Sequence, residues 1–365
     1  MCYVGIIVSS IVYRRFAKGK FPHKEIFFYE EAGKKYGLTP CYFRFDDIYE
    51  ERDELEAFVN GENGKFVIKK VPKPEVIHNR SFIHTIQQKR KLQGLLEQGI
   101  IIFNQYNRYP KLEIYEILNQ NEELIPFLPE TVKGSSSSLL KMMESHDELI
   151  IKPNKGSLGR GVVKLSWVNK ERWELSYFVN KSLETERFKT IWPKKLKQLM
   201  LNPNMIVQER IPLAHSKDGV FDLRVSVQKN DQGAWQVTGI AGKVAKEGSY
   251  LTNVAQGGRC KTLELLLQDM SHLDPEQVRK DIENLSIKIA KQLECELPHL
   301  ADVGLDIGIT HDGFPMFIEC NCRDLRYSFR NANLLNEWKK TYETPIGYAS
   351  YLYKQKKGAE NYEAM

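Results

Sequence analysis

Residues 303–321 contain three side chains, Asp306, Glu319 and Asn321, whose oxygen atoms suit a hard divalent cation. The residues around them are largely apolar, which argues against a solvated surface. On one sheet face the two carboxylates would repel each other unless a positive charge neutralised them. Mg²⁺ commonly binds through protein carboxylates together with substrate phosphates. The pattern predicts a magnesium site, and the alternative is a polar hairpin at a sheet edge.

A turn at Asp312-Gly313 is predicted to bring these side chains together. This dipeptide between two apolar runs favours a two-residue hairpin turn, which would pair His311 with Phe314. Further from the turn, Asp306 would then pair with Glu319. The asparagine two residues beyond the glutamate would share its face, because side chains alternate along a strand.

A glycine-rich stretch at 148–166, ELIIKPNKGSLGRGVVKLS, is a candidate phosphate site. Apolar runs flank the loop, so we expect strand, loop and strand rather than the strand and helix of a Walker or dinucleotide loop. Gly156, Gly159 and Gly161 would let backbone N–H groups approach phosphate oxygens, and Lys152 would add a positive charge. The alternative is a surface hairpin whose glycines serve only the turn.

Two further pairs of polar residues are candidates for ligand contact. Asp222 and Arg224 share a strand face by the period of two, so Arg224 would meet phosphate or acyl-phosphate oxygens while Asp222 orients it. The alternative is a structural salt bridge. Asn79 and Arg80 follow a strand end, where α/β sheets usually bind ligands. The alternative there is a polar loop.

The elements that must position these residues follow from hydrophobic periodicity and turn residues. The chain opens with a strand–helix–strand unit, which indicates a small α/β domain. Strands are expected at 3–8, 40–45, 66–70, 75–78, 100–103, 205–211, 222–227 and 235–245, with two more near 303–321; helices at 24–36, 86–98, 111–118, 139–144, 275–297 and 334–355; a mostly helical region at 171–200; and a polar loop at 247–260.

Composition bounds the class of protein. The chain has 365 residues, of which 42% are hydrophobic and 27% charged, with a net charge of +6. These values are typical of a globular protein of two or three domains. The basic residues are scattered, and no patch of interleaved aromatic and basic residues predicts nucleic-acid binding. No apolar stretch approaches the ~20 residues that span a bilayer, so no membrane insertion is expected.

The N-terminus and the cysteines favour a cytosolic protein. The first residues, MCYVGIIVSS, lack a basic leader and a cleavage site and are better interpreted as a strand. Of six cysteines only Cys320 and Cys322 lie close together, which indicates reduced thiols. No matching cysteine or histidine pair lies nearby, so zinc is not favoured.

The order and spacing of these motifs resemble the ATP-grasp superfamily over residues 107 to about 322. The resemblance implies an α/β (α+β) ATP-grasp fold behind an N-terminal α/β domain. It implies an N-terminal domain at 1–106, an ATP-grasp domain at 107–356 with a lid subdomain at about 130–210 and a metal-site subdomain at about 211–330, and a tail at 357–365. The matching residues are Lys152-Pro153, the loop 156–161, VQERI at 207–211, DLR at 222–224, Asp306, and ECN at 319–321.

In that superfamily each matching segment has a role toward Mg-ATP. The glycine loop, with Ser157 among its residues, and two lysines would clamp the phosphates, and the strand at 207–211 would offer backbone groups to adenine. The residues to which the resemblance gives these roles are Lys111, Lys152, Gly156, Ser157, Gly159 and Gly161 for phosphate, Gln208, Glu209, Arg210 and Ile211 for adenine, and Asp306, Glu319 and Asn321 for Mg²⁺.

A closer likeness is to the YheC/YheD family of endospore coat-associated proteins. It rests on VIHNR at 76–80, LPET at 128–131, FDLRVSVQK at 221–229 with a Gly-x-Trp hairpin after it, and TNVAQGG at 252–258. The chain departs from the family at Cys322-Arg323-Asp324-Leu325-Arg326, where a Ser-Lys-Pro-Gly-type continuation is usual. The resemblance implies a cytoplasmic protein associated with the spore coat.

The resulting prediction is an ATP- and Mg²⁺-dependent carboxylate–amine ligase that forms an acyl phosphate. Arg224 and Lys152 are its predicted catalytic residues, and Asn79, Arg80 and Arg323 its predicted substrate contacts. Its partners would be ATP, a carboxylate and a nucleophile. The alternatives are an ATP-grasp kinase that phosphorylates its substrate and a non-catalytic coat-associated protein that binds ATP.

Overall fold

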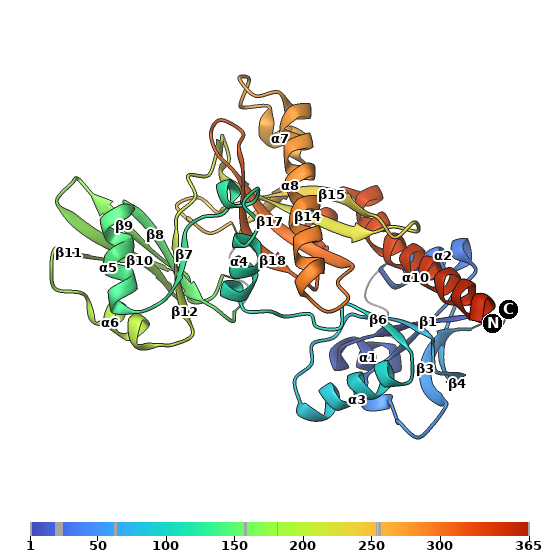
Figure 1. Ribbon diagram of the computed structural model, residues 1–365. Helices are drawn as coiled ribbons and strands as arrows, with labels where there is room; N and C mark the ends of the chain where they lie inside the picture. Colours follow the sequence, from blue (N-terminus) through green and yellow to red (C-terminus); the bar gives the residue numbers. More distant parts are fainter. Residues whose placement is uncertain are drawn as a thin grey trace.

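The computed structural model describes residues 2–18, 25–61, 64–156, 159–180, 182–252, 254 and 257–363. Three sheets follow one another along the chain and form three parts of the molecule (Figure 1). We call them the N-terminal sheet, in the order β4-β3-β2-β1-β5-β6, the lid sheet, in the order β11-β10-β9-β8-β12-β7, and the central sheet, in the order β16-β15-β14-β17-β18 with β13 paired to β14.

The N-terminal sheet confirms the predicted α/β unit. Its middle strands β2, β1, β5 and β6 pair in parallel, while β3 and β4 are added antiparallel at one edge. The strand β3 (Glu54–Asn60) was missing from the predicted elements. The other elements are β1 (Tyr3–Ile7), α1 (Ser10–Ala17), α2 (Glu25–Tyr36), β2 (Thr39–Phe43), a 3₁₀ turn (Phe45–Asp47), β4 (Phe66–Pro72), β5 (Val76–Asn79), α3 (Ile86–Glu97) and β6 (Ile101–Phe103).

The lid sheet corrects one prediction. The region 171–200 was expected to be mostly helical, but it forms the antiparallel strands β10 (Arg172–Val179) and β11 (Ser182–Phe188) before a short helix. Trp173 and Leu175 are buried at alternating positions, so the period of two outweighs the helix-favouring charges around them. The remaining elements are α4 (Lys111–Asn119), a 3₁₀ turn (Ile125–Phe127), β7 (Thr131–Lys133), α5 (Ser136–Ser145), β8 (Glu148–Pro153), β9 (Val163–Val168), α6 (Lys194–Leu201) and β12 (Met205–Glu209).

The central sheet holds the main hydrophobic core, which α8 covers. Along β14 the odd-numbered residues Leu223, Val225 and Val227 enter this core, so the even-numbered polar residues face the other way. Its elements are β13 (His215–Ser216), β14 (Gly219–Lys229), β15 (Trp235–Val244), β16 (Arg259–Lys261), α7 (Leu263–Leu267), α8 (Pro275–Glu296), β17 (Asp302–Ile309), β18 (Pro315–Asn321), α9 (Tyr327–Asn331) and α10 (Leu335–Glu363).

The hairpin between β17 and β18 differs from its predicted form. The N–H of Thr310 donates to the carbonyl of Phe314, and the N–H of Gly313 donates back to the carbonyl of Thr310, so the loop has three residues and ends in Gly313 at φ 80°. This shifts the register by one residue from the predicted pairing of His311 with Phe314. A bulge then shifts it back, because β18 has the extra residue Ile318 between the partners of Ile307 and Asp306.

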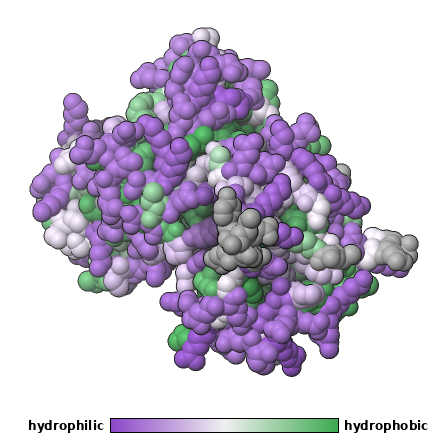
Figure 2. Space-filling view, turned by 45° about the vertical axis from the view of Figure 1, so that its right-hand side comes forward, coloured by the Kyte–Doolittle hydropathy of each residue, from purple (hydrophilic) through white to green (hydrophobic). Residues whose placement is uncertain are grey.

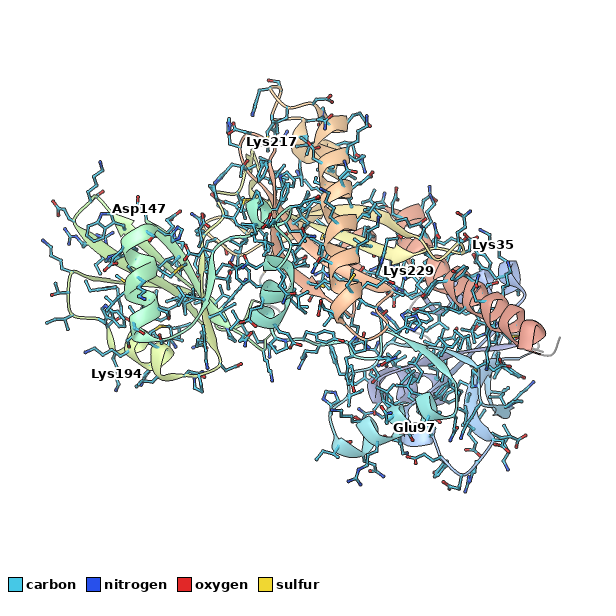
Figure 3. The ribbon with its side chains drawn as sticks, viewed as in Figure 1. Lys35, Glu97, Asp147, Lys194, Lys217 and Lys229 are labelled. Atoms are coloured by element: carbon cyan, nitrogen blue, oxygen red, sulfur yellow. The ribbon has the colours of Figure 1, made fainter. Side chains whose placement is uncertain are left out.

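The last helix, α10, joins the central and N-terminal parts (Figure 1). Its buried residues Trp338, Tyr342 and Ile346 share one core cluster with residues of α2 and of the N-terminal sheet. On the outside Lys35 of α2 forms an ion pair with Glu343 of α10; Lys35 is labelled beside α10 in Figure 3. The helix therefore fixes the N-terminal part against the central sheet.

The surface is mostly polar. Figure 2 shows a face on which hydrophilic residues dominate and hydrophobic residues are scattered in small groups. Within the described residues, none of the helices combines the length and the apolar character that crossing a bilayer requires.

Candidate active site

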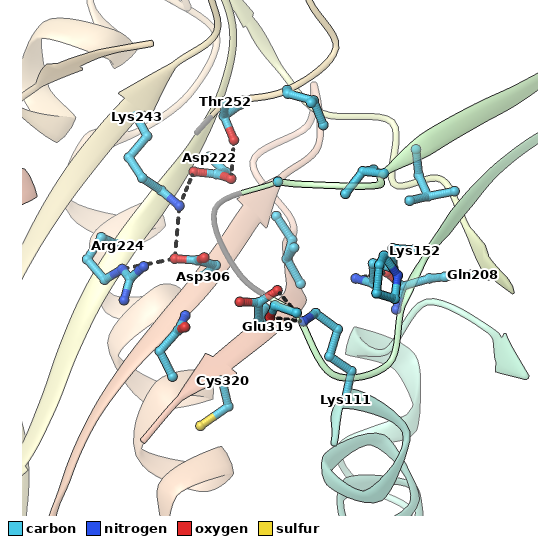
Figure 4. A pocket seen from close by; sticks show the side chains of 18 of the residues that line it. Lys111, Lys152, Gln208, Asp222, Arg224, Lys243, Thr252, Asp306, Glu319 and Cys320 are labelled. Carbon is cyan, nitrogen blue, oxygen red and sulfur yellow. Dashed lines mark hydrogen bonds and ion pairs between the residues drawn. The ribbon is translucent and has the colours of Figure 1, made fainter. Parts of the chain in front are cut away.

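A pocket of about 340 Å³ lies where the lid sheet, the central sheet and the start of α4 meet (Figure 4). Of the residues predicted for the site, Gly161, Asn79 and Arg80 do not line this pocket, and Ser157 lies outside the described residues. The predicted residues that line it are Lys111, Lys152, Gly156, Gly159, Gln208, Glu209, Arg210, Ile211, Arg224, Asp306, Glu319, Asn321 and Arg323.

Lys152 is a buried amine held by a polar chain. Its Nζ donates to Oε1 of Gln208 at 2.7 Å, and Nε2 of Gln208 donates to Oγ1 of Thr131 at 2.7 Å. Burial lowers the pKa of Lys152 to about 8, although the carboxylate of Glu319 acts in the opposite direction. The chain thus presents a fixed cation to the pocket, and Thr131, in the LPET motif, is a supporting residue that the sequence analysis missed.

Lys111 connects the glycine loop to the predicted metal hairpin. It begins α4 directly after Pro110. Its Nζ donates to the carbonyl oxygen of Gly156 at 3.0 Å and lies 3.4 Å from Oε2 of Glu319. An anion bound between the loop and the hairpin would meet this side chain.

Asp306 and Glu319 lie opposite each other on β17 and β18, as predicted. The carboxylate of Asp306 is already paired, because its Oδ1 lies 3.0 Å from Nε of Arg224 and 2.9 Å from Nζ of Lys243. Burial would raise the pKa of Asp306, but Arg224 and Lys243 hold it below its usual value. Nearby cationic side chains therefore supply part of the neutralisation that the sequence analysis assigned to a metal ion alone.

The three side chains still offer oxygen donors of the kind that a hard cation prefers. Asn321 lies on β18 two residues beyond Glu319, and its Nδ2 is buried with no hydrogen-bond partner among the described residues. The described part of the chain contains no group of three or more His, Cys, Asp or Glu that could hold a metal. Two carboxylates and one amide are a small donor set, of the kind that Mg²⁺ completes with water and substrate phosphates.

Arg224 has different partners from the predicted one. Its acidic partners are Asp306 and Asp324. NH1 of Arg224 lies 3.3 Å from Oδ1 of Asp324. Asp222 instead pairs with Nζ of Lys243 at 3.0 Å and accepts a hydrogen bond from Thr252. The prediction that Asp222 orients Arg224 is therefore wrong, because neighbouring strands place acids and bases across the sheet and not along one strand.

Lys243 and Asp324 are central to the site and were missed. Lys243 had a signal in the sequence, since it is a lone charge within the apolar run of β15. Asp324 had none that identified its role. It is fully buried, accepts from Oγ of Ser226 at 2.6 Å, and fits only because Gly304 has no side chain there.

Asn79 and Arg80 make contacts within the chain, and their predicted contact with substrate stays a prediction. Asn79 is fully buried, and its amide donates to the carbonyl of Gln105 and accepts from the backbone of Ser81. NH1 of Arg80 lies 3.2 Å from Oδ2 of Asp302, and its NH2 donates to the carbonyl oxygen of Asp324. Arg80 thus joins the N-terminal sheet to β17 and to the segment after β18, whereas Asn79 holds the segments that follow β5 and β6.

The strand predicted to contact adenine lines the pocket, but two of its backbone donors are used. The N–H of Glu209 donates to Glu130 and that of Arg210 to Glu148. Arg210 also forms an ion pair with Glu148. A ligand at this edge would therefore meet the side chains and carbonyl groups more readily than these two N–H groups.

Comparison with known proteins decides the family. A family model described as YheC/D like ATP-grasp matches residues 99–352. The chain belongs to this family. The YheC/D-like chain is 26% identical over 346 residues to the endospore coat-associated protein YheD of Bacillus subtilis (strain 168), covering 91% of this chain and 74% of YheD. It is 23% identical over 301 residues to YheC of the same strain, covering 77% and 79%.

The membership confirms the predicted α/β ATP-grasp fold. Among solved structures, the ATP-grasp ligase PsnB with its minimal precursor has a TM-score of 0.49 at 15% identity, covering 91% of this chain and 95% of PsnB. The D-cycloserine synthetase DcsG has a TM-score of 0.49 at 10% identity, covering 94% and 99%. These identities are too low to transfer a ligand or a substrate to the YheC/D-like chain.

Proposed function

We propose that this chain is an ATP- and Mg²⁺-dependent ligase that joins a carboxylate to an amine or a similar nucleophile through an acyl phosphate. One observation carries the proposal. A single pocket gathers two lysines beside the glycine loop, the opposed carboxylates of Asp306 and Glu319, and the guanidinium of Arg224. Phosphoryl transfer to a carboxylate needs cations that bind phosphate, oxygen donors that hold a metal ion, and a fixed arginine.

Each part has a distinct role in the proposal. Lys111 and Lys152 hold phosphate oxygens, and the buried position of Lys152 strengthens its attraction for them. The hairpin residues Asp306, Glu319 and Asn321 would hold Mg²⁺, which supplies charge neutralisation for the phosphates when bound.

The proposed reaction has two balanced steps. A carboxylate oxygen of the substrate bonds to the γ-phosphorus of ATP, the bond from that phosphorus to the bridging oxygen breaks, and ADP leaves. The amine nitrogen then bonds to the acyl carbon, the carbon–oxygen bond to phosphate breaks, and the nitrogen loses a proton to the solvent. Arg224, fixed by Asp306 and Asp324, neutralises negative charge on the acyl phosphate.

The cellular setting is also a proposal. YheD and YheC carry the name endospore coat-associated protein. We place this chain in the cytoplasm of a sporulating cell, where it associates with the spore coat. Its carboxylate and amine substrates would come from the same cell.

Phosphorus NMR with ATP, Mg²⁺ and a metabolite extract of sporulating cells tests the proposal. The unaltered chain is expected to form ADP and inorganic phosphate only when the extract is present. Glu319→Gln keeps the shape of the side chain and should reduce this turnover by about 100-fold or more. Glu123→Gln, at an exposed ion pair with Lys288, is the matched control and should leave it unchanged.

Two outcomes would contradict the proposal. Full activity of a folded Glu319→Gln variant would remove the metal assignment. A new phosphoester signal without free phosphate would identify a kinase instead of a ligase.

A further inference from the structure

A second pocket of about 160 Å³ lies beside the first, between the N-terminal sheet and the segment after β18. Arg323 and Leu325 line both pockets, so the two spaces meet at this segment. An engineered protein cavity of similar size, about 150 Å³, holds one benzene molecule. The second pocket therefore has room for a single ring or a branched alkyl group.

The walls of this side pocket are mainly apolar. Phe16, Tyr29, Tyr42 and Tyr342 line it together with aliphatic residues of β1 and α1. Two of the three tyrosine hydroxyls in its walls have other partners: that of Tyr42 donates to Glu30, and that of Tyr29 accepts from Arg326. The pocket thus offers ring faces and alkyl groups, which favour an apolar occupant.

The junction of the two pockets carries a positive charge without a partner acid. Within the described part of the chain, Arg323 forms no ion pair or hydrogen bond; its guanidinium lies over the ring of Phe82, 4.6 Å from the centroid. Burial, together with the charges of Arg80 and Arg108, lowers the pKa of Arg323 to about 10. A half-buried cation beside like charges is costly unless an anion joins it.

Arg80, another cation of the side pocket, has partners of its own. Its guanidinium contacts the carboxylate of Asp302 and the carbonyl oxygen of Asp324. A cation without an acidic partner among the described residues, Arg323, therefore lies at the junction, next to the pocket proposed for ATP. An apolar chamber that opens past a cation toward a phosphoryl donor fits an acid with an apolar tail.

We infer that the side pocket binds the apolar group of the substrate acid, of about one aromatic ring in size, while Arg323 binds the carboxylate of that acid. The inference rests on the proposed ligase function and names its substrate class: small carboxylic acids that carry an aryl or branched alkyl group. Arg323 acts here as a binding and specificity-determining residue. The nucleotide occupies only the first pocket.

The test uses 3-phenylpropionate as the probe, with affinity measured by ligand-observed NMR on the full chain. Propionate lacks the ring, and 3-phenylpropan-1-ol lacks the carboxylate. Each is expected to bind about tenfold more weakly than the probe, because one loses apolar burial and the other the charged contact. Equal binding of the probe and of propionate would overturn the inference.

Two variants locate the probe. Val12→Trp places a larger side chain in the side pocket from α1, and Arg323→Gln removes the charge. Both variants should weaken the binding of the probe about tenfold or more, and Val12→Trp, at a residue that lines only the side pocket, should leave the affinity for ADP unchanged. Val67→Trp on the exposed edge strand β4 and Arg90→Gln on α3 are the matched controls and should change neither affinity.

The outcomes separate this inference from the proposed function. If Val12→Trp binds the probe as the unaltered chain does, the pocket assignment is wrong. If Arg323→Gln lowers the affinity for ADP but not the affinity for the probe, the arginine belongs to the nucleotide site and the inference also fails. If the probe binds as expected while no acid ever supports ATP turnover, the pocket stands and the ligase proposal fails.

Discussion

The amine of Lys243 lies 2.9 Å from Oδ1 of Asp306, so a buried cation sits beside a residue of the proposed metal site. On its other side the same amine is 3.0 Å from Asp222, and beyond Asp306 lies Arg224. Acids and bases thus alternate across β15, β14 and β17 (Figure 4). The floor of the pocket is a balanced row of charges whose members depend on one another.

This row predicts a strong coupling between Lys243 and Asp222. Lys243→Met should lower the free energy of unfolding by about 3–5 kcal/mol, because it leaves buried carboxylates without their cation. Asp222→Asn combined with Lys243→Met should recover much of that loss, because the uncompensated charge of Asp222 is then gone. Urea denaturation of the single and double variants measures the coupling. Simple addition of the two single effects would contradict it; Lys288→Met, at an exposed pair, should cost less than about 1 kcal/mol.

The pKa of Lys152 predicts how ATP binding depends on pH. Burial lowers this pKa to about 8, so the ammonium is present below pH 8 and is lost as the pH rises through that value. The dissociation constant for ATP should therefore increase above pH 8, by up to about tenfold per pH unit. Calorimetric titration between pH 7 and 9.5 measures it. The Lys152→Met variant should bind ATP weakly, with a dissociation constant that does not change around pH 8. A constant affinity of the unaltered chain across this pH range would refute the assignment.

Gly304 is predicted to be required for the position of Asp324. A Cβ atom at this residue would lie 2.6 Å from NH1 of Arg224 and 2.8 Å from Cγ of Asp324. Gly304→Ala should lower the free energy of unfolding by about 1–3 kcal/mol and reduce turnover, because the arginine must move. Denaturation and ATP turnover test this. Gly358→Ala is the control, since a Cβ there meets nothing within 4 Å; an unaffected Gly304→Ala variant would show that the packing has room.

The buried histidine His78 predicts sensitivity to acid. Burial lowers its pKa to about 4, even though Nε2 lies 3.3 Å from Oδ2 of Asp302. Below about pH 6.5 the unfolded chain binds a proton that the folded chain does not, so stability falls as the pH drops toward 4. The loss is up to about 1.4 kcal/mol per pH unit, and His299, whose pKa burial also lowers to about 4, adds a similar term.

The measurement for this prediction is urea denaturation at pH 4.5 and pH 7. His78→Gln should reduce the difference in stability between the two pH values, and His311→Gln, at an exposed side chain, should not. Asp302 does not interfere, because Arg326, His78 and Arg80 outweigh its burial and hold its pKa below the usual range, so its effect falls at lower pH. An unchanged difference in His78→Gln would assign the acid sensitivity elsewhere.

Local patterns predicted much of the fold because strand and helix periodicities are local. The alternation in 222–227 predicted a strand with one polar face, and Asp274 ahead of 275–297 predicted the start of α8. The helix predicted at 171–200 was wrong, because the charged residues on the exposed faces of β10 and β11 are also common in helices. The strand register predicted from the Asp312-Gly313 turn was wrong by one residue. A bulge at Ile318, which no sequence pattern indicated, restores the predicted pairing of Asp306 with Glu319.

The sequence by itself determined the family. It also determined that Asp306 lies opposite Glu319 and that Lys152 lies beside a glycine loop, because adjacent segments of one hairpin or one strand fix these two relationships. The tertiary structure decided the rest. The order β15-β14-β17 placed Lys243 between two acids, and the chain after β18 brought Asp324 to Arg224. Buried charges must find partners wherever the sheet order places them, and that order depends on packing between segments far apart in the chain.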